Sequence, residues 1–510
     1  MTTSADHLPP LIRSLLAPSR YPHPVTEVCL METHISWVLL AGEFAYKLKK
    51  AVNFGFLDFS TLERRKFCCE EELRLNRRQA PDLYLDVIAI TGAEADPHLG
   101  GDNDVIEYAV KMRRFEQYNL FEQRLKAGTI TADDIDRVAV CLAHFHEKIA
   151  VAKDSDIFGS LDNIRRYSEE NCRVVAPLLE NSVDRQHMDE YQDFLNQQHP
   201  QLASIFSERK HNGHIRECHG DLHIRNILLE NGNIRFFDCI EFNPELRWVD
   251  TLSELAFLAM DLEANGYAIF SHRLINHYLE LSGDYAGAPV LPYYLAYRAM
   301  VRAKVALLRL PQAESDSEKT ALRQNCGEYL QLAWRYALKK SPALIITHGL
   351  SGSGKSTHTQ WLVDRLGAVK LRSDVERKRR FAANTHSDKN NSTHASSTST
   401  LYSAATTRDT YEYLLSTAES LLEAGFPVII DATHLQRWQR DLFRAAASAR
   451  DIPFFIVNFD IPLAELEKRI AVRQTQARDA SDATVEVLHQ QLASREPLDG
   501  EELAHVFNFE

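Results

Sequence analysis

The sequence lacks long hydrophobic runs, paired cysteine motifs and an excess of basic residues. Its longest apolar runs, such as Leu255–Met260, fall far short of the roughly 20 residues that a membrane helix needs. The amino terminus shows neither a basic start nor a following apolar stretch, which are the two marks of a secretion signal. These absences predict a cytoplasmic protein with no membrane partner.

The eight cysteines are scattered along the chain, without a C-x-x-C pair or the Cys/His spacing of a metal site. They are expected to be reduced and mostly buried. The formal net charge of −13 excludes the basic surface typical of proteins that bind nucleic acids, so a nucleic-acid partner is not expected. A small site lined by arginines can still hold a single phosphate group.

What the sequence does contain is ordinary globular material, with 45% hydrophobic and 25% charged residues over 510 positions. At roughly 100–200 residues a domain, this length predicts two to four domains. Basic residues close a helical stretch at 335–340, proline follows at Pro342, and a β-branched run begins at Leu344. Because cations in a last turn followed by proline mark a helix end, we predict one domain over 1–340 and another over 341–510.

Residues 343–510 alternate between short β-branched segments and helical periods, a pattern typical of a parallel sheet covered by helices. The segment 384–400, rich in Ser, Thr, Asn and His without an apolar period, is predicted to be a solvated loop. The expected strands cover 343–347, 368–372, 427–431 and 454–459, and the expected helices cover 355–366, 408–424, 434–449 and 463–475.

The segment Gly349–Ser356 reads G-x-x-x-x-G-K-S, the phosphate-binding Walker A motif, and it lies between an expected strand and an expected helix. Glycines let the backbone curl so that successive N–H groups point at phosphate oxygens, and the positive end of the helix adds to that field. Lys355 is expected to reach the β and γ phosphates and to act in catalysis, and Ser356 is expected to bind Mg²⁺. The expected nucleotide-binding residues are Gly349, Ser351, Gly352, Ser353, Gly354, Lys355, Ser356 and Thr357.

Two carboxylates at the ends of expected strands complete this site. Asp431 ends the apolar run that begins at Pro427, and it is expected to hold the Mg²⁺. Asp374 follows an earlier strand, where a carboxylate can accept the proton of an acceptor hydroxyl, and Arg377 one turn later is expected to bind the substrate. As an alternative, both aspartates could cap the helices that follow them.

Three arginines follow in the last part of the chain. Arg469 and Arg473 are four residues apart on one face of an expected helix, and Arg478 lies just beyond them. Arginines on a closing segment stabilise charge on the transferring phosphoryl group, so Arg469 and Arg473 are expected to be catalytic and Arg478 to contact the nucleotide. A solvated basic helix face is the alternative.

These motifs together resemble the small-kinase branch of P-loop proteins, which includes polynucleotide 5′-kinases, gluconate-type kinases, zeta toxins and chloramphenicol phosphotransferase. The resemblance covers essentially all of residues 343–510 and rests on the Walker A motif, Asp374 with Arg377, Asp431-Ala-Thr433 and the arginine series. It implies transfer of a phosphoryl group from ATP, with GTP as an open alternative, to a hydroxyl group with the help of Mg²⁺. It does not identify the acceptor.

Residues 1–340 begin with strand-like segments and continue as helices. From Thr131 onward the period is helical, except for two short strands around the turn Asn231-Gly232. A β-rich front followed by a helical back resembles a two-lobed kinase. Strands are expected at 25–31, 36–40, 44–48 and 105–112, and a helix is expected from the capping-box sequence at Ser60 to Arg78.

The segment His219–Asn226 carries Asp221 and, five residues later, Asn226, and Asp238 follows across the hairpin. This spacing, H-x-D-x-x-x-x-N, is similar to the catalytic loop of the aminoglycoside phosphotransferase family. By that resemblance Asp221 is the catalytic base, and Asn226 and Asp238 bind Mg²⁺ beside ATP. His219 is expected to shape the loop and to contact the substrate. Antibiotic resistance is not implied, because the helical part shows no motif of an aminoglycoside pocket.

The nucleotide lysine of such a kinase lies on an early strand. Lys47 and Lys49 face the same side of the expected strand, and Lys47 is favoured for the nucleotide phosphates. Its ion-pair partner is expected on the following helix, where Glu71 is chosen among three adjacent glutamates because apolar residues flank it at four-residue spacing. Met112 is expected beside adenine. No glycine-rich flap precedes Lys47, so the sequence does not indicate how the β-phosphate is held.

The leading hypothesis is a bifunctional kinase that combines a bilobal protein-kinase-like α+β fold with a P-loop α/β domain built on a parallel sheet. Each domain would phosphorylate a hydroxyl group of a small molecule. The alternative is a P-loop kinase that acts on nucleic-acid 5′ ends, with the front domain for recognition. A third hypothesis, a nucleotide-sensing regulator with an inactive front domain, is opposed by the presence of Asp221, Asn226 and Asp238. The acceptors and the oligomeric state are left open.

Overall fold

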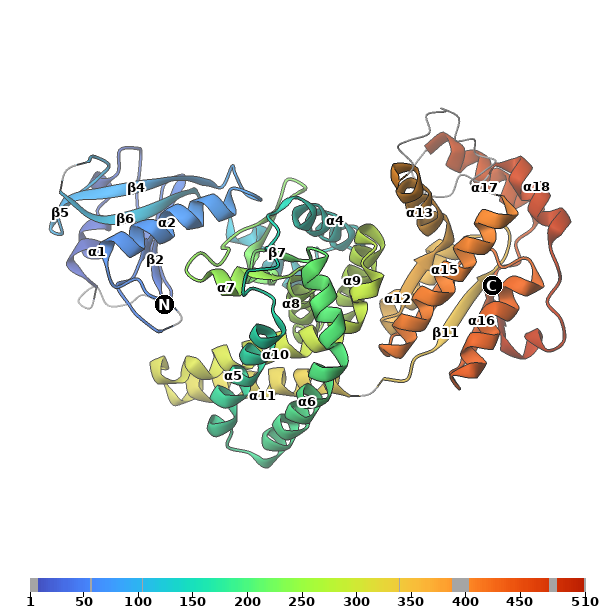
Figure 1. Ribbon diagram of the computed structural model, residues 1–510. Helices are drawn as coiled ribbons and strands as arrows, with labels where there is room; N and C mark the ends of the chain where they lie inside the picture. Colours follow the sequence, from blue (N-terminus) through green and yellow to red (C-terminus); the bar gives the residue numbers. More distant parts are fainter. Residues whose placement is uncertain are drawn as a thin grey trace. The chain divides into compact units, whose positions relative to one another are not determined.

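The computed structural model describes residues 8–55, 57–102, 104–338, 340–387, 403–476 and 484–508 (Figure 1). The chain separates into two compact units. The first consists of Met1–Tyr167 and Phe206–Asp261, and the second of Ser168–Ile205 and Leu262–Glu510. The second unit therefore contains helices from before residue 341 together with everything after it. The division into domains at 340/341 stays a prediction.

The first unit opens with a six-stranded antiparallel sheet in the order β1-β2-β3-β6-β4-β5. Four strands confirm the predicted positions. The other two, β4 and β5, were not predicted, because they contain Gly92 and Pro97, residues that sequence patterns assign to turns. Pairing of β3 with β6 places Ala45 opposite Met112. The strands are β1 (Val28–Glu32), β2 (Ser36–Ala41), β3 (Phe44–Lys49), β4 (Tyr84–Ala93), β5 (Asp96–Leu99) and β6 (Val105–Arg113).

Helix α2 (Leu62–Asn76) packs on this sheet. Its N-cap is Thr61, whose side chain accepts a hydrogen bond from the Arg64 N–H, so the predicted cap at Ser60 is one residue early. Ser60 instead donates to Asp58. The buried side chains of α2 form one stripe, made of Arg65, Cys68, Cys69, Glu72, Leu75 and Asn76.

The following part of the chain is mainly helical, as predicted. The hairpin of β8 (Ile227–Glu230) and β9 (Asn233–Phe236) confirms the two predicted strands, and Asn231 and Gly232 in its turn have φ angles of 51° and 76°. The pair β7 (Ile215–Glu217) and β10 (Trp248–Asp250) was not predicted. The helices are α1 (Pro10–Leu15), α3 (Phe121–Lys126), α4 (Ala132–Lys148), α5 (Leu161–Val175), α6 (Ser182–His211), α7 (Pro244–Arg247), α8 (Thr251–Ala264), α9 (Ala268–Ser282), α10 (Leu291–Leu308) and α11 (Asp316–Ala337).

The second unit ends in a five-stranded parallel sheet in the order β12-β13-β11-β14-β15. The predicted strands and helices are confirmed, whereas α13, α18 and β15 were not predicted. Helix α13 continues to Ser387, so the first residues of the predicted loop 384–400 are helical, because no glycine or proline ends the helix there. The rest of that loop lies outside the described residues. The elements are β11 (Leu344–His348), α12 (Lys355–Leu366), β12 (Val369–Arg372), α13 (Ser373–Ser387), α15 (Ala404–Glu423), β13 (Val428–Asp431), α16 (Arg437–Ala449), β14 (Phe454–Asn458), α17 (Leu463–Gln476), α18 (Val485–Ser494) and β15 (Val506–Asn508).

Within the described part of the chain, no helix combines the length and the apolar character that a bilayer crossing requires. The eight cysteines are free, and all except Cys29 and Cys141 are buried, as predicted. Burial raises the pKa of the Cys69 thiol to about 12, so this side chain stays protonated at neutral pH.

Candidate active sites

The phosphate loop connects β11 to α12 in the second unit. Gly352 and Gly354 have φ angles of 84° and 88°, a backbone conformation that residues with a Cβ rarely adopt. A Cβ at Gly349 would lie 2.7 Å from the carbonyl oxygen of Phe459. The turn therefore depends on glycine at three positions, and it leads into Lys355, the first residue of α12.

Lys355 is buried beneath this loop. Its Nζ donates hydrogen bonds to the carbonyl oxygens of Gly349 and Leu350 at 3.0 and 2.8 Å. The ammonium group and the N-terminus of α12 together form a positive site at the carboxyl end of the parallel sheet, which is where open α/β sheets bind their ligands.

A cavity of about 880 Å³ opens beside the loop, within the range typical of ligand sites. Gly349 and Ser353 shape the loop without lining the cavity. The side chain of Arg473 and all of Arg478 lie outside the described residues. The cavity brings together residues that the sequence predicts from separate segments: Ser351, Gly352, Gly354, Lys355, Ser356, Thr357, Asp374, Arg377, Asp431 and Arg469.

Asp431 ends β13 and faces this cavity as a buried carboxylate. Its Oδ2 accepts no hydrogen bond from the described residues, and the nearest cation is Arg372, whose Nε lies 3.9 Å away. A buried carboxylate oxygen without a donor is costly unless a cation satisfies it. Because the Ser356 hydroxyl group lines the same cavity, these two oxygen donors fit Mg²⁺, which prefers oxygen ligands.

Asp374 and Arg377 lie in the first turn of α13. Arg377 Nη1 lies 3.9 Å from Asp374 Oδ1, and the exposed fractions of the two side chains are 10% and 32%. The arginine is therefore part of the cavity wall, whereas the carboxylate is accessible from the cavity. This arrangement leaves Asp374 within reach of an acceptor hydroxyl group.

The cavity also contains side chains that the sequence did not single out. The rings of Tyr411 on α15 and Trp438 on α16 have centroids 5.5 Å apart, and the Arg408 guanidinium lies 4.8 Å from the Trp438 ring. Burial raises the pKa of Tyr411 to about 12. These residues lie far from the phosphate loop in the chain and follow no motif spacing, so only the folded structure reveals them.

Helix α18 contacts the phosphate loop through one amide side chain. The backbone N–H of Ser351 donates to Gln491 Oε1 at 2.9 Å, and Gln491 Nε2 donates to Ser351 Oγ at 2.9 Å. Helix α18 therefore fixes the middle of the loop.

In the first unit, Lys47 on β3 lies between two carboxylates. Its Nζ donates to Glu72 Oε1 at 2.8 Å and to Asp238 Oδ1 at 2.5 Å. The prediction that Glu71 pairs with Lys47 was wrong, because Glu71 binds arginines instead. The reason is the helix face: Phe67, one of the apolar residues that favoured Glu71, is 61% exposed, whereas the buried stripe of α2 contains Glu72.

A second lysine, Lys49, is fully buried beside this pair. Its Nζ donates to Glu72 Oε2 at 2.6 Å and also to Glu241. Burial opposes the charge on Glu72, but the two ammonium groups outweigh burial and lower its pKa. Burial raises the pKa of Glu241. The Lys49–Glu241 pair connects β3 to the segment that carries Asp238.

Asp221, Asn226 and Asp238 form the predicted catalytic segment. Asn226 Nδ2 donates to the backbone oxygen of Asp221 at 3.0 Å. Asp238 has a φ angle of 65°, uncommon for a residue other than glycine, and its N–H donates to the Tyr84 hydroxyl at 3.1 Å. The side chains of Asp221 and Asp238 are 38% and 45% exposed, so both can reach a ligand. Their roles as base and metal ligand stay predictions.

His219 is completely buried, so the predicted contact with substrate was wrong. Its ring donates through Nε2 to the carbonyl oxygen of Phe237 at 2.8 Å, and its Nδ1 accepts from the Asp221 N–H at 3.3 Å. His219 thus joins the segment of Asp221 to the segment of Asp238. It is a positioning residue.

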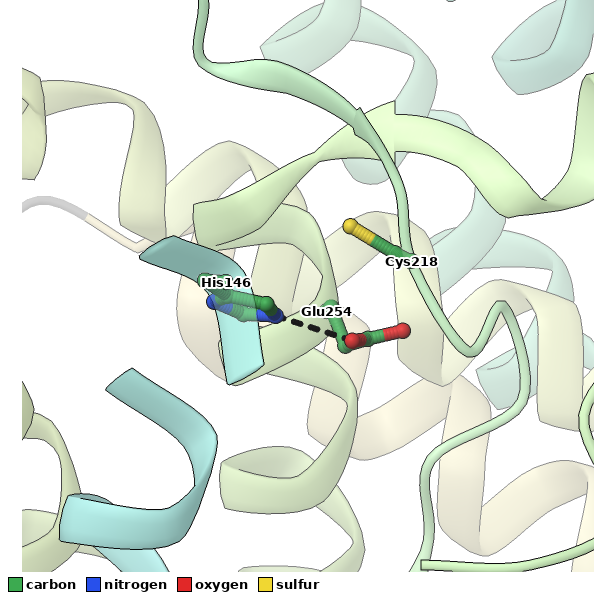
Figure 2. A group of neighbouring side chains, drawn as sticks. All are labelled: His146, Cys218 and Glu254. Carbon is green, nitrogen blue, oxygen red and sulfur yellow. Dashed lines mark hydrogen bonds and ion pairs between the residues drawn. The ribbon is translucent and has the colours of Figure 1, made fainter. Parts of the chain in front are cut away.

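Glu254 on α8 anchors the same loop (Figure 2). Its Oε1 accepts from the backbone N–H groups of His219 and Gly220 at 2.6 and 2.8 Å, and its Oε2 lies 2.8 Å from His146 Nε2. The atoms that could bind a metal ion in His146, Cys218 and Glu254 lie within 4.8 Å of one another, a spacing that suits such an ion. Because both carboxylate oxygens already take part in hydrogen bonds, we interpret this buried group as a bracket for the catalytic loop.

Met112 lies on β6 opposite Ala45 and Tyr84. Its side chain is half-buried against the core cluster that includes Tyr84. Contact of Met112 with adenine stays a prediction.

A family model described as an AAA domain matches residues 344–498, which include the phosphate loop and four strands of the parallel sheet. An uncharacterized protein of Mycobacterium tuberculosis (strain H37Rv) is 31% identical over 472 residues, covering 91% of this chain and 90% of that protein. An uncharacterized protein of Mycobacterium bovis matches to the same extent. This similarity therefore extends through both units.

Two solved structures are similar to parts of the chain. A choline kinase of Cryptosporidium parvum is 12% identical and covers 63% of this chain and 94% of its own, with a TM-score of 0.40. A sugar kinase of Janibacter is 19% identical and covers 33% of this chain and 84% of its own, with a TM-score of 0.24. The first is similar to the N-terminal region and the second to the C-terminal part.

Proposed function

The chain belongs to the same family as these mycobacterial proteins, and since that relationship spans both units, we propose that it is a phosphotransferase with two nucleotide sites on one polypeptide. Each site transfers a phosphoryl group from ATP to a hydroxyl group of a small molecule. The observation that carries the proposal is the cavity in which Lys355, Asp374, Asp431 and Arg469 come together from four separate elements.

In the second unit, the backbone N–H groups of the phosphate loop and the Lys355 ammonium group bind the nucleotide phosphates. Asp374 accepts the proton of the attacking hydroxyl group, and Arg469 stabilises charge on the phosphoryl group in transfer. Ser356 and Asp431 hold Mg²⁺, which neutralises charge on the phosphate oxygens.

In the first unit, Glu72 fixes Lys47 for the nucleotide phosphates, because the ammonium group is already paired at 2.8 Å. Asp221 accepts the proton of the acceptor, and Asn226 and Asp238 supply oxygen ligands for Mg²⁺. The hydrogen bonds of His219 and Glu254 hold these side chains in register without contacting substrate.

The acceptors are small hydroxyl compounds rather than nucleic acids, because a net charge of −13 repels phosphate-rich polymers. A cytoplasmic location follows from the use of ATP. These assignments extend the proposal to the acceptor compounds and to the cellular location of the protein.

Activity measurements on the full-length chain test the two sites separately. ADP release is followed with sugars, nucleosides, aminoglycosides, 5′-hydroxyl oligonucleotides and water as acceptors. We expect Lys355→Ala and Asp221→Asn each to abolish one activity, and the double variant to lose both. Lys319→Ala, which removes a lysine on the exposed side of α11, is the control and should match the wild type. Unchanged ADP release by the double variant would refute the proposal.

A further inference from the structure

The cavity of the second unit has more positive charge than a nucleotide requires. Its lining contains the aspartates Asp374 and Asp431 and no other acidic side chain among the described residues. Against these two negative charges stand five cations: Lys355, Arg372, Arg377, Arg408 and Arg469.

Three of these cations have an assigned counter-charge. Lys355 and Arg469 belong to the nucleotide phosphates under the proposed function. Arg372 lies 3.4 Å from Glu280 Oε1 and 3.9 Å from Asp431 Oδ2, so it is balanced within the second unit.

Arg377 and Arg408 also line this cavity, as does the proposed base Asp374. Arg377 is buried in the wall beside Asp374. Arg408 is exposed on α15, where it stacks on Trp438 and forms no ion pair with any residue that the structure describes. Two guanidinium groups and one aspartate therefore line the same cavity as the position of the acceptor hydroxyl group.

Aromatic side chains complete this wall. Tyr411 lines the same cavity as both arginines, and its ring centroid lies 5.5 Å from that of Trp438. Ring faces of this kind pack against the apolar face of a sugar or of another ring, while guanidinium groups bind carboxylate or phosphate in a bidentate manner.

We infer that the acceptor of the second-unit site is a small hydroxyl compound that carries an anionic group, phosphate or carboxylate, bound by Arg377 and Arg408. The inference rests on the proposed function of that site and adds the chemical class of its substrate. The anionic group lies against the two guanidinium groups, and the hydroxyl group lies at Asp374.

Calorimetric titration of the full-length chain, saturated with Mg²⁺ and the nonhydrolysable ATP analogue AMP-PNP, tests this inference. The probes are glucose, glucose 6-phosphate, glucuronate and inorganic phosphate, which share parts of one structure and differ in charge. We expect an anionic probe to bind more tightly than glucose. Arg408→Gln should weaken that binding about tenfold or more, as expected for the loss of a charge-assisted hydrogen bond.

The chain offers a matched control. Arg365 also stacks on a tryptophan, Trp361, with 5.6 Å to the ring, but it lies on α12 outside the cavity. Arg365→Gln should leave probe binding unchanged. Because Arg408 is exposed, its replacement should not affect folding, and equal thermal midpoints of the two variants would verify this.

Each outcome has a defined meaning. Binding of glucose 6-phosphate alone identifies a phosphate ester, and binding of glucuronate alone identifies a carboxylate. Glucose binding as strongly as the anions, absence of anion binding, or equal binding in the Arg408→Gln variant would overturn the inference. A 5′-hydroxyl oligonucleotide that binds instead of the small anions would also overturn it. If Lys355→Ala removes no AMP-PNP binding, the proposed function fails, which is a separate result.

Discussion

The Glu72 carboxylate pairs with two lysine ammonium groups, and each of its oxygens binds a different lysine. Lys49 is the more enclosed of the two, with 1% of its side chain exposed, and it also binds Glu241. A complete buried ion network adds little net stability, but removal of one member leaves an uncompensated charge in a region without water. The Lys49 position is therefore sensitive to substitution.

We expect Lys49→Met to destabilise the protein by about 3–5 kcal/mol, the range typical for removal of one partner from a buried ion pair. Lys66→Met is the control, because Lys66 is about half exposed and lies 3.9 Å from an exposed Glu70. It should change the free energy of unfolding by less than about 1 kcal/mol. Urea unfolding of the full-length chain measures both, and equal midpoints would contradict the burial argument.

His434, next to the phosphate loop, is a buried histidine that excludes a proton. Its Nδ1 donates to the Thr347 carbonyl oxygen at 2.7 Å, and its Nε2 is buried without a hydrogen-bond partner in the described part of the chain. Burial lowers its pKa to about 3. In the unfolded chain the same group binds a proton below about pH 6.5.

A lowered pKa means that His434 stabilises the fold fully above about pH 6.5 and less as the pH falls toward 3. We expect a loss of about 1.4 kcal/mol per pH unit in that window. His434→Asn, which tolerates the positive φ angle of 45°, should flatten this dependence. His211→Asn, which replaces an exposed histidine, should leave the pH dependence of stability unchanged. Thermal midpoints measured between pH 7.5 and 5 test this prediction. The same dependence of the midpoint on pH in the two variants would contradict it.

Among the elements, α4 and α8 hold the loop that carries Asp221 through His146 and Glu254. Two backbone N–H groups of the loop donate to a single carboxylate oxygen on α8. Loss of that acceptor removes a hydrogen bond from each of these buried N–H groups, and a buried donor that loses its partner costs about 1–3 kcal/mol. The loop is then held less firmly to the segment of Asp238, through the hydrogen bonds of His219.

We expect Glu254→Ala to lower turnover at the first-unit site at least about tenfold, since about 1.4 kcal/mol corresponds to a factor of ten. In the Lys355→Ala background, ADP release reports this site alone. In the Asp221→Asn background, the same substitution should leave the second-unit activity unchanged. A similar loss at both sites would show that Glu254 supports folding in general rather than the loop.

The elements also show how far sequence patterns reach. Apart from α13, which was not predicted, the strands and helices from β11 to α17 follow their predicted bounds closely, because buried parallel strands read as apolar runs and the phosphate loop marks the point where β11 gives way to α12. Strands β4 and β5 were missed because Gly92 and Pro97 read as turn residues. Helix α18 was missed because nothing local marks it as part of the site, although Gln491 binds the phosphate loop.

Errors in the predicted sites have a similar cause. Motif residues such as Lys355, Asp374 and Asp431 follow local rules, and the structure brings them to one cavity. The choice of Glu71 over Glu72 depended on which face of α2 meets the sheet. The burial of the His219 side chain could be predicted only from the residues that pack around it. Arg408, Tyr411 and Trp438 reach the cavity only through the packing of α15 and α16. These are properties of tertiary structure, and no spacing in the sequence reports them.

For the whole molecule, the net charge is −13, whereas the cavity of the second unit is lined by five cations and two anions. A negative surface with a local positive cavity favours small anions over nucleic-acid polymers. The two proposed sites also lie in different compact units. Each proposed site contains its own lysine and its own carboxylates, so loss of one should leave the other able to bind nucleotide.

The stoichiometry of nucleotide binding tests the two-site account most directly. Titration of the full-length chain with AMP-PNP and Mg²⁺ is predicted to give two equivalents for the wild type. One equivalent is predicted for Lys355→Ala and one for Asp238→Asn, and none for the double variant. A single equivalent in the wild type, or a stoichiometry that neither substitution changes, would contradict the account.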